Sequence, residues 1–423
     1  MTVQQPLQRP LRVALYGNMC NFLYQIAKAL RGPGPGIPGI DAHLYIERTA
    51  DLQNCPESDD PELAGAYPAW IHVGDWLHGR RRMAGIAWPA LLPVVSEWRG
   101  YDMLLVSAEG PSVAQFAGRP YVFITGGGDL TLMPFPERYA STDQGAGMFR
   151  ALAWRLRAHW QRKGILQAAA VLTQPFQPFL DALRQLGVPA SSVASTTSLL
   201  TLDTDRFMRV EGRGAQLPES LRDADFIVFQ PSRMMIRDDP MLRATGQWKG
   251  NDVLLRGFAA FVASGAAARP RLVLIERAHS PDIVLAKAEI ERLGIAGHVT
   301  WLRGPTAEGF SRHDLFRLYS ASDVVADDFG AGWFGSVALE ACAAECPVLT
   351  YVDEGAMGKM YPYHPFVNAR TDAEVADRLA QLCRDPAGRR AIGKRAREWV
   401  IKFHSPQGHG EQLRSELLRL LPQ

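Results

Sequence analysis

The chain has 423 residues, of which 47% are hydrophobic and 21% charged, and its formal net charge is +2. This length exceeds one ordinary hydrophobic core and favours two domains of roughly 200 residues each, in a soluble globular protein. The nearly neutral charge gives no general case for a nucleic-acid-binding protein, so we expect no nucleic-acid partner.

Cysteine spacing and hydropathy favour a cytoplasmic protein. The cysteines are Cys20, Cys55, Cys342, Cys346 and Cys383. Their number is odd, and their spacing forms neither a disulfide framework nor a CxxC metal motif. The first residues lack an apolar signal-peptide core, and no run of about 18 apolar residues follows. We therefore expect reduced thiols, no metal site and no membrane span.

The first half of the chain alternates short apolar runs with stretches of helical periodicity. A strand is expected at 11–16, a break at Gly17-Asn18 and a helix at 22–30. The later elements expected in this half are strands at 42–46, 101–107, 121–125 and 169–173 and helices at 149–167 and 179–186. Residues 51–93 are rich in Trp, Pro and Gly, and we expect an irregular excursion there that carries specificity.

The second half repeats this alternation after a crossing segment at 203–217. Strands are expected at 226–229, 272–276, 299–302, 323–326 and 347–352, and helices at 253–262, 336–344, 373–383, 388–400 and 412–421. Asn251 or Asp252 is placed to cap the helix at 253–262.

Strands that alternate with helices twice over predict an α/β fold of two doubly wound parallel sheets. We place the first domain at 1–205 and the second at 215–404. The last helix, within 405–423, is expected to pack back on the first domain.

The loop between the last two strands of the second domain predicts a nucleotide site. Gly330, Gly332 and Gly335 let the backbone turn sharply and approach a ligand. Ser336 opens the next helix, whose free N–H groups and positive dipole end suit a phosphate. Glu340 lies one turn further, where a carboxylate can accept hydrogen bonds from ribose hydroxyls. Glycine loops also occur in doubly wound sheets without this role, and Glu340 alone would fit a solvated helix residue.

Further charged residues fall where predicted strands end or a helix begins, the usual ligand position in parallel sheets. They are Arg233, Lys249, Glu276, Arg303, Asp327 and Asp328. Arg233 supplies a planar fork and Lys249 a point charge for a diphosphate, while the backbone at Gly335-Ser336-Val337 supplies N–H donors. Single cations in loops are usually solvated, so the hypothesis depends on their joint placement.

The segments VFQPSR, WKGNDVLLRGF, HVTWLRG and FGSVALEACAAECPVLTY resemble the family-four retaining glycosyltransferases. The resemblance extends over nearly the whole chain, and YGNMCNFLYQIAKALR and GGGDL carry it in the first half. It implies a GT-B fold, in which two Rossmann-like domains face a central cleft. It also implies that Arg233 and Lys249 bind the donor diphosphate, that Glu340 binds the donor ribose and that Trp333-Phe334-Gly335 faces phosphate and sugar.

One departure from the family pattern concerns the donor sugar. The first glutamate of the E-x7-E motif falls on Gly332, which has no side chain. We expect Asp328, or else Asp327, to replace it; alternatively the donor sugar differs or the activity is reduced.

A second departure concerns the first domain, where no histidine lies at 107–110. Glu109 or Asp129 is expected near the reacting centre instead. Gly17, Asn18 and Asp129 are expected to face the cleft and the acceptor.

The resemblance implies a hexosyltransferase of polysaccharide or glycoconjugate biosynthesis. It would move a sugar from a nucleotide-diphosphate sugar, with UDP favoured, to a hydroxyl of a glycan, lipid-linked or small-molecule acceptor, with retention of configuration. It implies no metal and no other cofactor, because cationic side chains and a helix end stabilise the leaving diphosphate.

Two alternatives remain open. The first is a non-catalytic or partner-dependent GT-B binding subunit with a degenerate donor site, which Gly332 favours. The second is a nucleotide-dependent oxidoreductase, for which the GxGxxG motif is missing.

The expected helix at 149–167 carries five cations and no acid, together with Trp154 and Trp160. It is compatible with peripheral contact to an anionic membrane surface, which would place the protein at the inner face of the membrane. The other interpretation is an ordinary domain helix that has solvated arginines and inward tryptophans.

Overall fold

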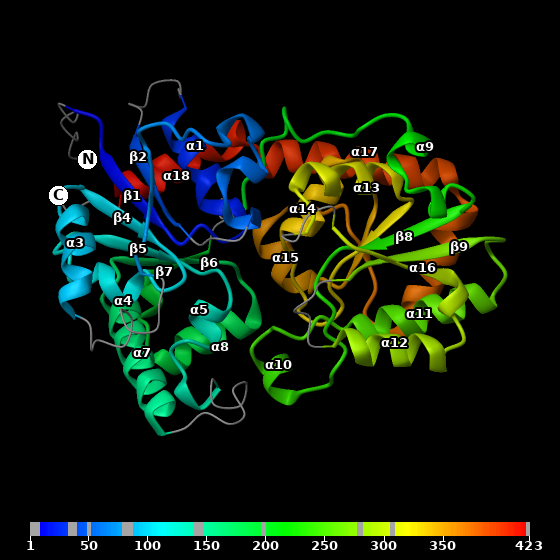
Figure 1. The fold of residues 1–423 in the computed structure, drawn as a ribbon, viewed down its shortest axis with the longest axis horizontal. Helices are drawn as coiled ribbons and strands as arrows, with labels where there is room; N and C mark the ends of the chain where they lie inside the picture. Colours follow the sequence, from blue (N-terminus) through cyan, green and yellow to red (C-terminus); the bar gives the residue numbers. More distant parts are fainter. Residues whose placement is uncertain are drawn as a thin grey trace. The chain divides into compact units, whose positions relative to one another are not determined.

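The structure is a computed structural model that describes residues 9–32, 40–48, 52–77, 88–138, 148–195, 200–276, 282–304 and 309–419. The chain forms two compact units (Figure 1). The first unit consists of Met1–Thr201 and Pro406–Gln423, and the second consists of Leu202–Ser405. The chain therefore leaves the first unit, completes the second and returns to the first with its last helix.

In the described part of the first unit, a seven-stranded sheet has the order β3-β2-β1-β4-β5-β6-β7, and the strand pairs are all parallel. The strands are β1 (Arg12–Tyr16), β2 (Asp41–Glu47), β3 (Ile71–Gly74), β4 (Met103–Val106), β5 (Tyr121–Ile124), β6 (Ala170–Thr173) and β7 (Val193–Ser195). The inner strands β4, β5 and β6 are buried along their whole length, as expected for a parallel sheet covered on both faces.

Helices cover both faces of this sheet (Figure 1). Those in the described residues are α1 (Phe22–Arg31), α3 (Trp88–Trp98), α4 (Pro111–Ala114), α5 (Gly128–Thr131), α7 (Met148–Gln167), α8 (Gln177–Leu186) and α18 (Pro406–Arg419). On β1, Val13 and Leu15 pack with α1 and α18, whereas Ala14 and Tyr16 pack with α3 and α4. This is the period of two that a strand imposes on its side chains.

Helix α18 packs against α1 of the first unit. Leu413 and Leu417 are buried in the same core cluster as Leu30. Arg414 donates hydrogen bonds at 2.6 Å to the carbonyl oxygens of Ala29 and Gly32, at the end of α1.

The excursion predicted at 51–93 is more regular than expected. It contains β3, the beginning of α3 and short 3-10 turns, while 49–51 and 78–87 lie outside the described residues. The prediction of no elements was wrong because β3 is a four-residue edge strand and α3 contains Pro93. The 3-10 turns in the described residues of both units are η1 (Met19–Asn21), η2 (Leu52–Asn54), η3 (Pro56–Ser58), η4 (Pro61–Leu63), η5 (Ala190–Ser192), η7 (Glu219–Leu221) and η8 (Ala296–His298).

The described part of the second unit contains a six-stranded parallel sheet with the order β10-β9-β8-β11-β12-β13. The strands are β8 (Phe226–Gln230), β9 (Pro270–Ile275), β10 (Val299–Leu302), β11 (Val324–Ala326), β12 (Val348–Thr350) and β13 (Val367–Asn368). The expected strand at 299–302 has the observed bounds, and β13 was not predicted.

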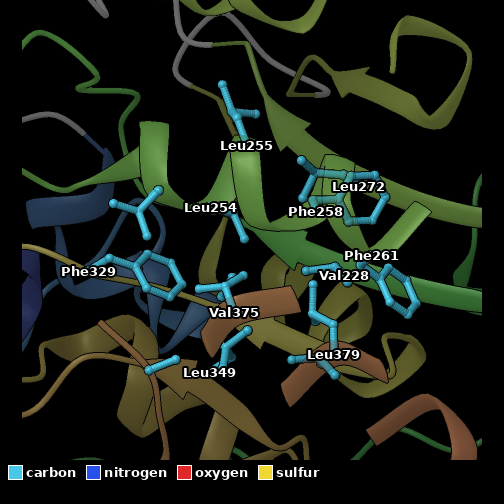
Figure 2. Close-up of a cluster of buried hydrophobic side chains, with 14 of the residues drawn as sticks. Val228, Leu254, Leu255, Phe258, Phe261, Leu272, Phe329, Leu349, Val375 and Leu379 are labelled. Atoms are coloured by element: carbon cyan, nitrogen blue, oxygen red, sulfur yellow. The ribbon is translucent and has the colours of Figure 1, made fainter. Parts of the chain in front are cut away.

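The helices of the second unit are α9 (Arg213–Gln216), α10 (Pro240–Ala244), α11 (Asn251–Ala263), α12 (Ile283–Arg292), α13 (Arg312–Ala321), α14 (Ser336–Ala343), α15 (Glu354–Met360), α16 (Asp372–Arg384) and α17 (Pro386–His404). Figure 2 shows the core that α11 and α16 form with the sheet, in which Leu254 and Phe258 lie near Val375 and Leu379. All four side chains are buried, so this core fixes the start of α11 beneath the strand ends.

The cap predicted for α11 was wrong. The N-cap residue is Gly250, with a positive φ of 61°, and no side chain caps the helix. Asn251 instead accepts a hydrogen bond at 2.7 Å from the backbone N–H of Met235, which follows β8. Its side chain therefore joins two loops of the sheet and does not cap its own helix.

Candidate functional site

The strands of the second sheet end along one edge, which we call the carboxyl edge, and ligands of α/β proteins bind at such edges. Strands β8 and β11 are neighbours there. Arg233 follows β8, whereas Asp327 and Asp328 follow β11. The candidate site is built from these strand ends, from Lys249 ahead of α11 and from the start of α14.

Lys249 is fixed at the carboxyl edge by its backbone and its side chain. Its carbonyl oxygen accepts a hydrogen bond from the N–H of Phe329 at 2.9 Å, and its Nζ lies 2.7 Å from Oδ2 of Asp328. At Gly250, which has φ of 61°, a Cβ would lie 3.0 Å from Phe329. Glycine accommodates both the positive φ and the close approach to Phe329, so the loop places Lys249 at the end of β11.

Lys249 forms a charged cluster with the two aspartates, which are buried. Burial lowers the pKa of Lys249, but Asp328 and Asp327 outweigh it, so the pKa is raised and the side chain is a cation at neutral pH. Burial raises the pKa of Asp327, against the opposing effect of Lys249. Asp327 also accepts a hydrogen bond from Ser232 Oγ at 2.6 Å.

Asp328 holds the glycine loop as well as the lysine. Its Oδ1 accepts the backbone N–H groups of Gly330 and Ala331, each at 2.8 Å. Both carboxylate oxygens therefore have partners within the protein, and these contacts favour a structural role in the loop over a contact to a sugar.

Arg233 lies in the turn after β8, next to Ser232 and therefore close to the charged cluster. Its side chain is exposed and donates a hydrogen bond at 2.7 Å to Oε1 of Gln247. The positive charge of Arg233 lowers the pKa of Lys249, against the effect of the two aspartates, so the two cations lie close enough to repel each other. The structure thus brings both predicted diphosphate ligands to one place.

The start of α14 lies at the same edge. Gly335 is its N-cap residue, no side chain caps the helix and no acid lies in its first turn. Gly335, Ser336 and Val337 are only half-buried, so their N–H groups and the positive helix end are accessible to an anion. Phe334 anchors the preceding loop, because its ring packs 5.5 Å from the ring of Trp399 and 5.1 Å from that of Phe366.

Glu340 is buried, so its interpretation as a solvated helix residue was wrong. Its Oε2 accepts a hydrogen bond from the Tyr319 hydroxyl at 3.0 Å, and its Oε1 lies 3.1 Å from Nε of Arg312. Both partners are on α13. No sequence pattern indicated these partners, because the contacts depend on how α13 packs against α14.

Gly332 has φ of 74°, in the left-handed region that favours glycine. A Cβ at this position would lie 3.1 Å from Cε1 of Tyr351, and the Gly332 carbonyl accepts the N–H of Asp353 at 2.9 Å. The ring of Tyr351 is in turn covered by the guanidinium of Arg370, 4.9 Å from the ring centroid. The space beside Gly332 is therefore occupied by an aromatic and a cationic side chain.

We expect Gly332→Glu to lower the free energy of unfolding of the second unit by about 1–2 kcal/mol, because a side chain in this conformation is strained. Chemical denaturation monitored by hydrogen exchange within the second unit measures the effect. Gly335→Ala is the matched control, because φ there is −124° and, apart from the two chain neighbours, no atom of the described residues lies within 4 Å of the added Cβ. Equal stability of the glutamate variant and the control would contradict this reading of Gly332.

Glu276 and Arg303 pair with each other at the ends of β9 and β10. Arg303 Nε lies 2.8 Å and Lys287 Nζ 2.6 Å from the Glu276 carboxylate. These hydrogen bonds lower the pKa of Glu276, and the one from Arg303 has the largest effect. Among the described residues, neither Glu276 nor Arg303 forms an ion pair with Lys249 or Asp328.

In the first unit, Gly17 and Asn18 shape the loop after β1. Gly17 has φ of 103°, and a Cβ there would lie 2.6 Å from the carbonyl oxygen of Ser107 at the end of β4. Asn18 is buried and accepts the N–H of Tyr24 at 2.8 Å while donating to Asn21 and Asn54. Both residues therefore hold the loop in position.

Asp129 holds two strand-end loops of the first sheet together. It is buried, and it accepts hydrogen bonds from Ser107 Oγ and from the N–H groups of Ala108, Gly126 and Gly127. Burial raises its pKa to about 6, and the four donors oppose this rise. These contacts favour a role in positioning the loops after β4 and β5.

Glu109 lies beside the same loop, and its carboxylate is 2.7 Å from Nη2 of Arg157 on α7. Arg157 is thus directed into the first unit.

Among the described residues, no helix is both long enough and apolar enough to cross a membrane.

Comparison with known proteins gives a match to a family model and to solved structures. Residues 242–399, which include Lys249, α11 and α14, match the family model described as "Glycosyl transferases group 1". Among solved structures, HepE of Anabaena in complex with UDP and glucose has a TM-score of 0.64 at 18% identity, over 97% of this chain and 100% of that chain. The fold is GT-B.

Two further structures are similar to this GT-B protein. Sucrose-phosphate synthase of Thermosynechococcus elongatus has a TM-score of 0.63 at 17% identity, over 97% of this chain and 99% of that one. A glycosyltransferase of Rickettsia africae has a TM-score of 0.60 at 14% identity, over the same shares of the two chains. No curated protein matches the chain in sequence.

Proposed function

We propose that this protein is a glycosyltransferase that binds a nucleotide-diphosphate sugar at the carboxyl edge of its second sheet. The observation that carries the proposal is the gathering of Lys249, Arg233 and the uncapped start of α14 at one edge. This edge belongs to the part of the chain that matches the group 1 family model.

Each part of the site has a role in this proposal. Lys249 and Arg233 bind the diphosphate and stabilise the charge that develops as it leaves, and the N–H groups at the start of α14 bind its oxygens. Glu340, oriented by Arg312 and Tyr319, binds the ribose. These groups supply the charge stabilisation, so the proposal requires no metal ion.

The reaction proposed is hexosyl transfer to a hydroxyl of a glycan, lipid-linked or small-molecule acceptor, with retention of configuration. The acceptor hydroxyl would attack from the face that the nucleotide leaves, and a donor phosphate oxygen would take its proton. We assign the acceptor to the first unit, where Asp129 and Gly17 shape the loops after β4, β5 and β1.

UDP is the favoured nucleotide, because the similar structures of Anabaena HepE contain UDP or UDP-glucose. We expect UDP to raise the melting temperature of the protein more than GDP, ADP or dTDP, by an amount that grows with nucleotide concentration. Thermal unfolding with each nucleotide measures this. The UDP shift is expected to vanish in Lys249→Ala and to persist in Lys394→Ala, an exposed lysine on α17.

A second candidate function is a binding subunit with a degenerate donor site, and Gly332 is the observation that favours it. The absence of a shift with all four nucleotides would make this candidate the leading one. Because Gly332 adopts a conformation suited to glycine, restoring glutamate there is a poor test, and the nucleotide panel distinguishes the two functions better.

We further propose that α7 contacts an anionic membrane surface from the cytoplasm. Met148, Phe149 and Leu152 are 81%, 84% and 53% exposed at its first turns, and Arg155 and Lys163 are exposed further along it. Apolar residues beside cations are the pattern of a helix that lies at a membrane interface.

Replacing Phe149 and Leu152 with serine is expected to reduce binding to vesicles that contain phosphatidylglycerol by at least tenfold. Co-sedimentation at two salt concentrations measures this, and the wild-type binding should fall as salt rises. Val284→Ser, which removes an exposed apolar side chain from α12, is the control. Wild-type binding that depends on neither the lipid charge nor the salt concentration would exclude the contact of α7 with an anionic membrane.

A further inference from the structure

The second unit has a pocket at the opposite edge of its sheet, where the strands begin. Its volume is about 160 Å³. Asp323, directly before β11, and Pro347, directly before β12, lie in its wall. The pocket therefore lies at the other end of the strands from Lys249.

Asp323 is the buried centre of this pocket, with 3% exposure. Its carboxylate accepts two hydrogen bonds from Arg213, at 2.9 and 2.7 Å, and one from Arg389 at 2.8 Å. It also accepts the backbone N–H of Ile227 at 2.8 Å. One carboxylate thus joins two guanidinium groups and has four donors.

The pocket carries more positive charge than Asp323 can balance. Arg209, Arg213, Arg389 and Arg390 line it, against the two carboxylates of Asp323 and Glu345. Formally this leaves an excess of two positive charges.

Two of these arginines have weak internal partners or none. Arg209 lies 3.7 Å from Glu211, whose side chain is 87% exposed, so water screens this pair. Arg390 makes no hydrogen bond or ion pair with any of the described residues.

A buried hydroxyl adds a neutral donor to this wall. Ser320 is 3% exposed and lines the pocket. Its Oγ accepts the backbone N–H of Val210 at 2.9 Å and donates to none of the described residues. A hydroxyl at such depth normally donates its proton as well, so its hydrogen is available to an acceptor in the pocket.

We propose that this pocket binds a phosphate dianion, either inorganic phosphate or the phosphate group of a small phosphomonoester. The excess of two positive charges matches the charge of the dianion, and guanidinium groups bind phosphate oxygens in a forked geometry. The volume holds a phosphate group but is below the roughly 300 Å³ of sites for drug-sized ligands, so a nucleotide does not fit.

A phosphate in this pocket would join two segments of the second unit. The second unit begins at Leu202, and the first segment is the stretch from there to α9, which begins at Arg213. Arg209 lies in this segment and Arg213 at its end. Arg389 and Arg390 lie on α17. The same helix already holds this segment, because Arg397 donates to the carbonyl oxygens of Thr204 and Phe207. Binding is expected to stabilise this packing without competing for the carboxyl edge, and it does not depend on the proposed function.

The test is the binding of inorganic phosphate, measured by thermal unfolding at constant ionic strength with chloride as the reference anion. The Lys249→Ala background removes phosphate binding at the carboxyl edge. We expect Arg209→Gln with Arg390→Gln to weaken phosphate binding by at least tenfold. The matched control, Arg317→Gln with Arg395→Gln, removes two exposed arginines of the same unit outside this pocket and should change binding by less than twofold.

Several outcomes would overturn the proposal. They are no stabilisation by phosphate beyond chloride, equal weakening in both double variants, and unchanged affinity in the pocket variant. If the pocket variant does not fold, Arg390→Gln alone should still weaken binding, because it breaks no hydrogen bond or ion pair to a described residue. Wild-type affinity should also fall from pH 7.5 to pH 5.5, as phosphate loses its second charge.

The source of the phosphate is decided by vesicles of phosphatidylcholine with and without phosphatidic acid, whose headgroup is a phosphomonoester. Binding to phosphatidic acid that depends on Arg209 and Arg390 assigns the pocket to a lipid headgroup. Stabilisation by free phosphate without such vesicle binding assigns it to a soluble ligand.

Discussion

Replacing Lys249 with methionine is expected to lower kcat for sugar transfer by about 10²- to 10³-fold, the usual loss when one preorganised donor to developing charge is removed. Lys249 is held at the carboxyl edge by Asp328 and by the backbone of Phe329, and its raised pKa keeps it charged. The expected rate loss follows because methionine keeps an unbranched side chain that is one atom shorter than lysine and removes its charge and its donors. Steady-state kinetics with the UDP-sugar that the nucleotide panel favours measures it.

The same change also leaves the buried carboxylate of Asp328 without its cation, which destabilises the loop. The double variant Lys249→Met with Asp328→Asn removes both charges and should recover stability without recovering turnover. Lys249→Arg keeps a cation and should retain more activity than methionine. Wild-type turnover in a folded Lys249→Met variant would remove Lys249 from the proposed mechanism.

The parallel sheets were predictable because their inner strands are continuous apolar runs. The expected strand at 226–229 corresponds to β8 and that at 121–125 to β5, both buried throughout. Three strands were missed, namely β3, β7 and β13, and each lies at an edge of its sheet. An edge strand pairs on one side only and is short here, so its formation depends on the neighbouring strand more than on its own sequence.

The site was predictable as a set of strand ends but not as a set of contacts. The sequence placed Arg233, Lys249 and Asp328 at one edge, because parallel strands end together. It could not show that Asp328 pairs with Lys249 or that Arg312 pairs with Glu340, since these contacts join segments that are far apart in the chain. It also could not show that Asp129 accepts hydrogen bonds from four donors, because three of these donors are backbone groups whose direction the fold alone determines.

Truncating Trp399 to alanine is expected to lower the free energy of unfolding of the second unit by about 3–5 kcal/mol. Trp399 is fully buried on α17, and its ring lies 5.0 Å from that of Tyr361 and 4.7 Å from that of His404. Its Nε1 donates to the carbonyl oxygen of Tyr363 at 2.9 Å, so the change removes a hydrogen bond as well as apolar contacts. Hydrogen exchange of the amides in α14 and α17 measures the loss of stability in the second unit.

This truncation also reaches the candidate site, because Trp399 packs against Phe334 in the loop that leads to Gly335. UDP affinity is therefore expected to fall by at least tenfold in Trp399→Ala and by less in Trp399→Phe, which keeps an aromatic ring beside Phe334. Trp98→Ala is the matched control, since Trp98 is equally buried but belongs to the first unit. It should leave the protection of α14 and the affinity for UDP within twofold of wild type. If both variants weakened UDP binding equally, the loss would reflect general destabilisation. The inference that Trp399 anchors the loop would then be wrong.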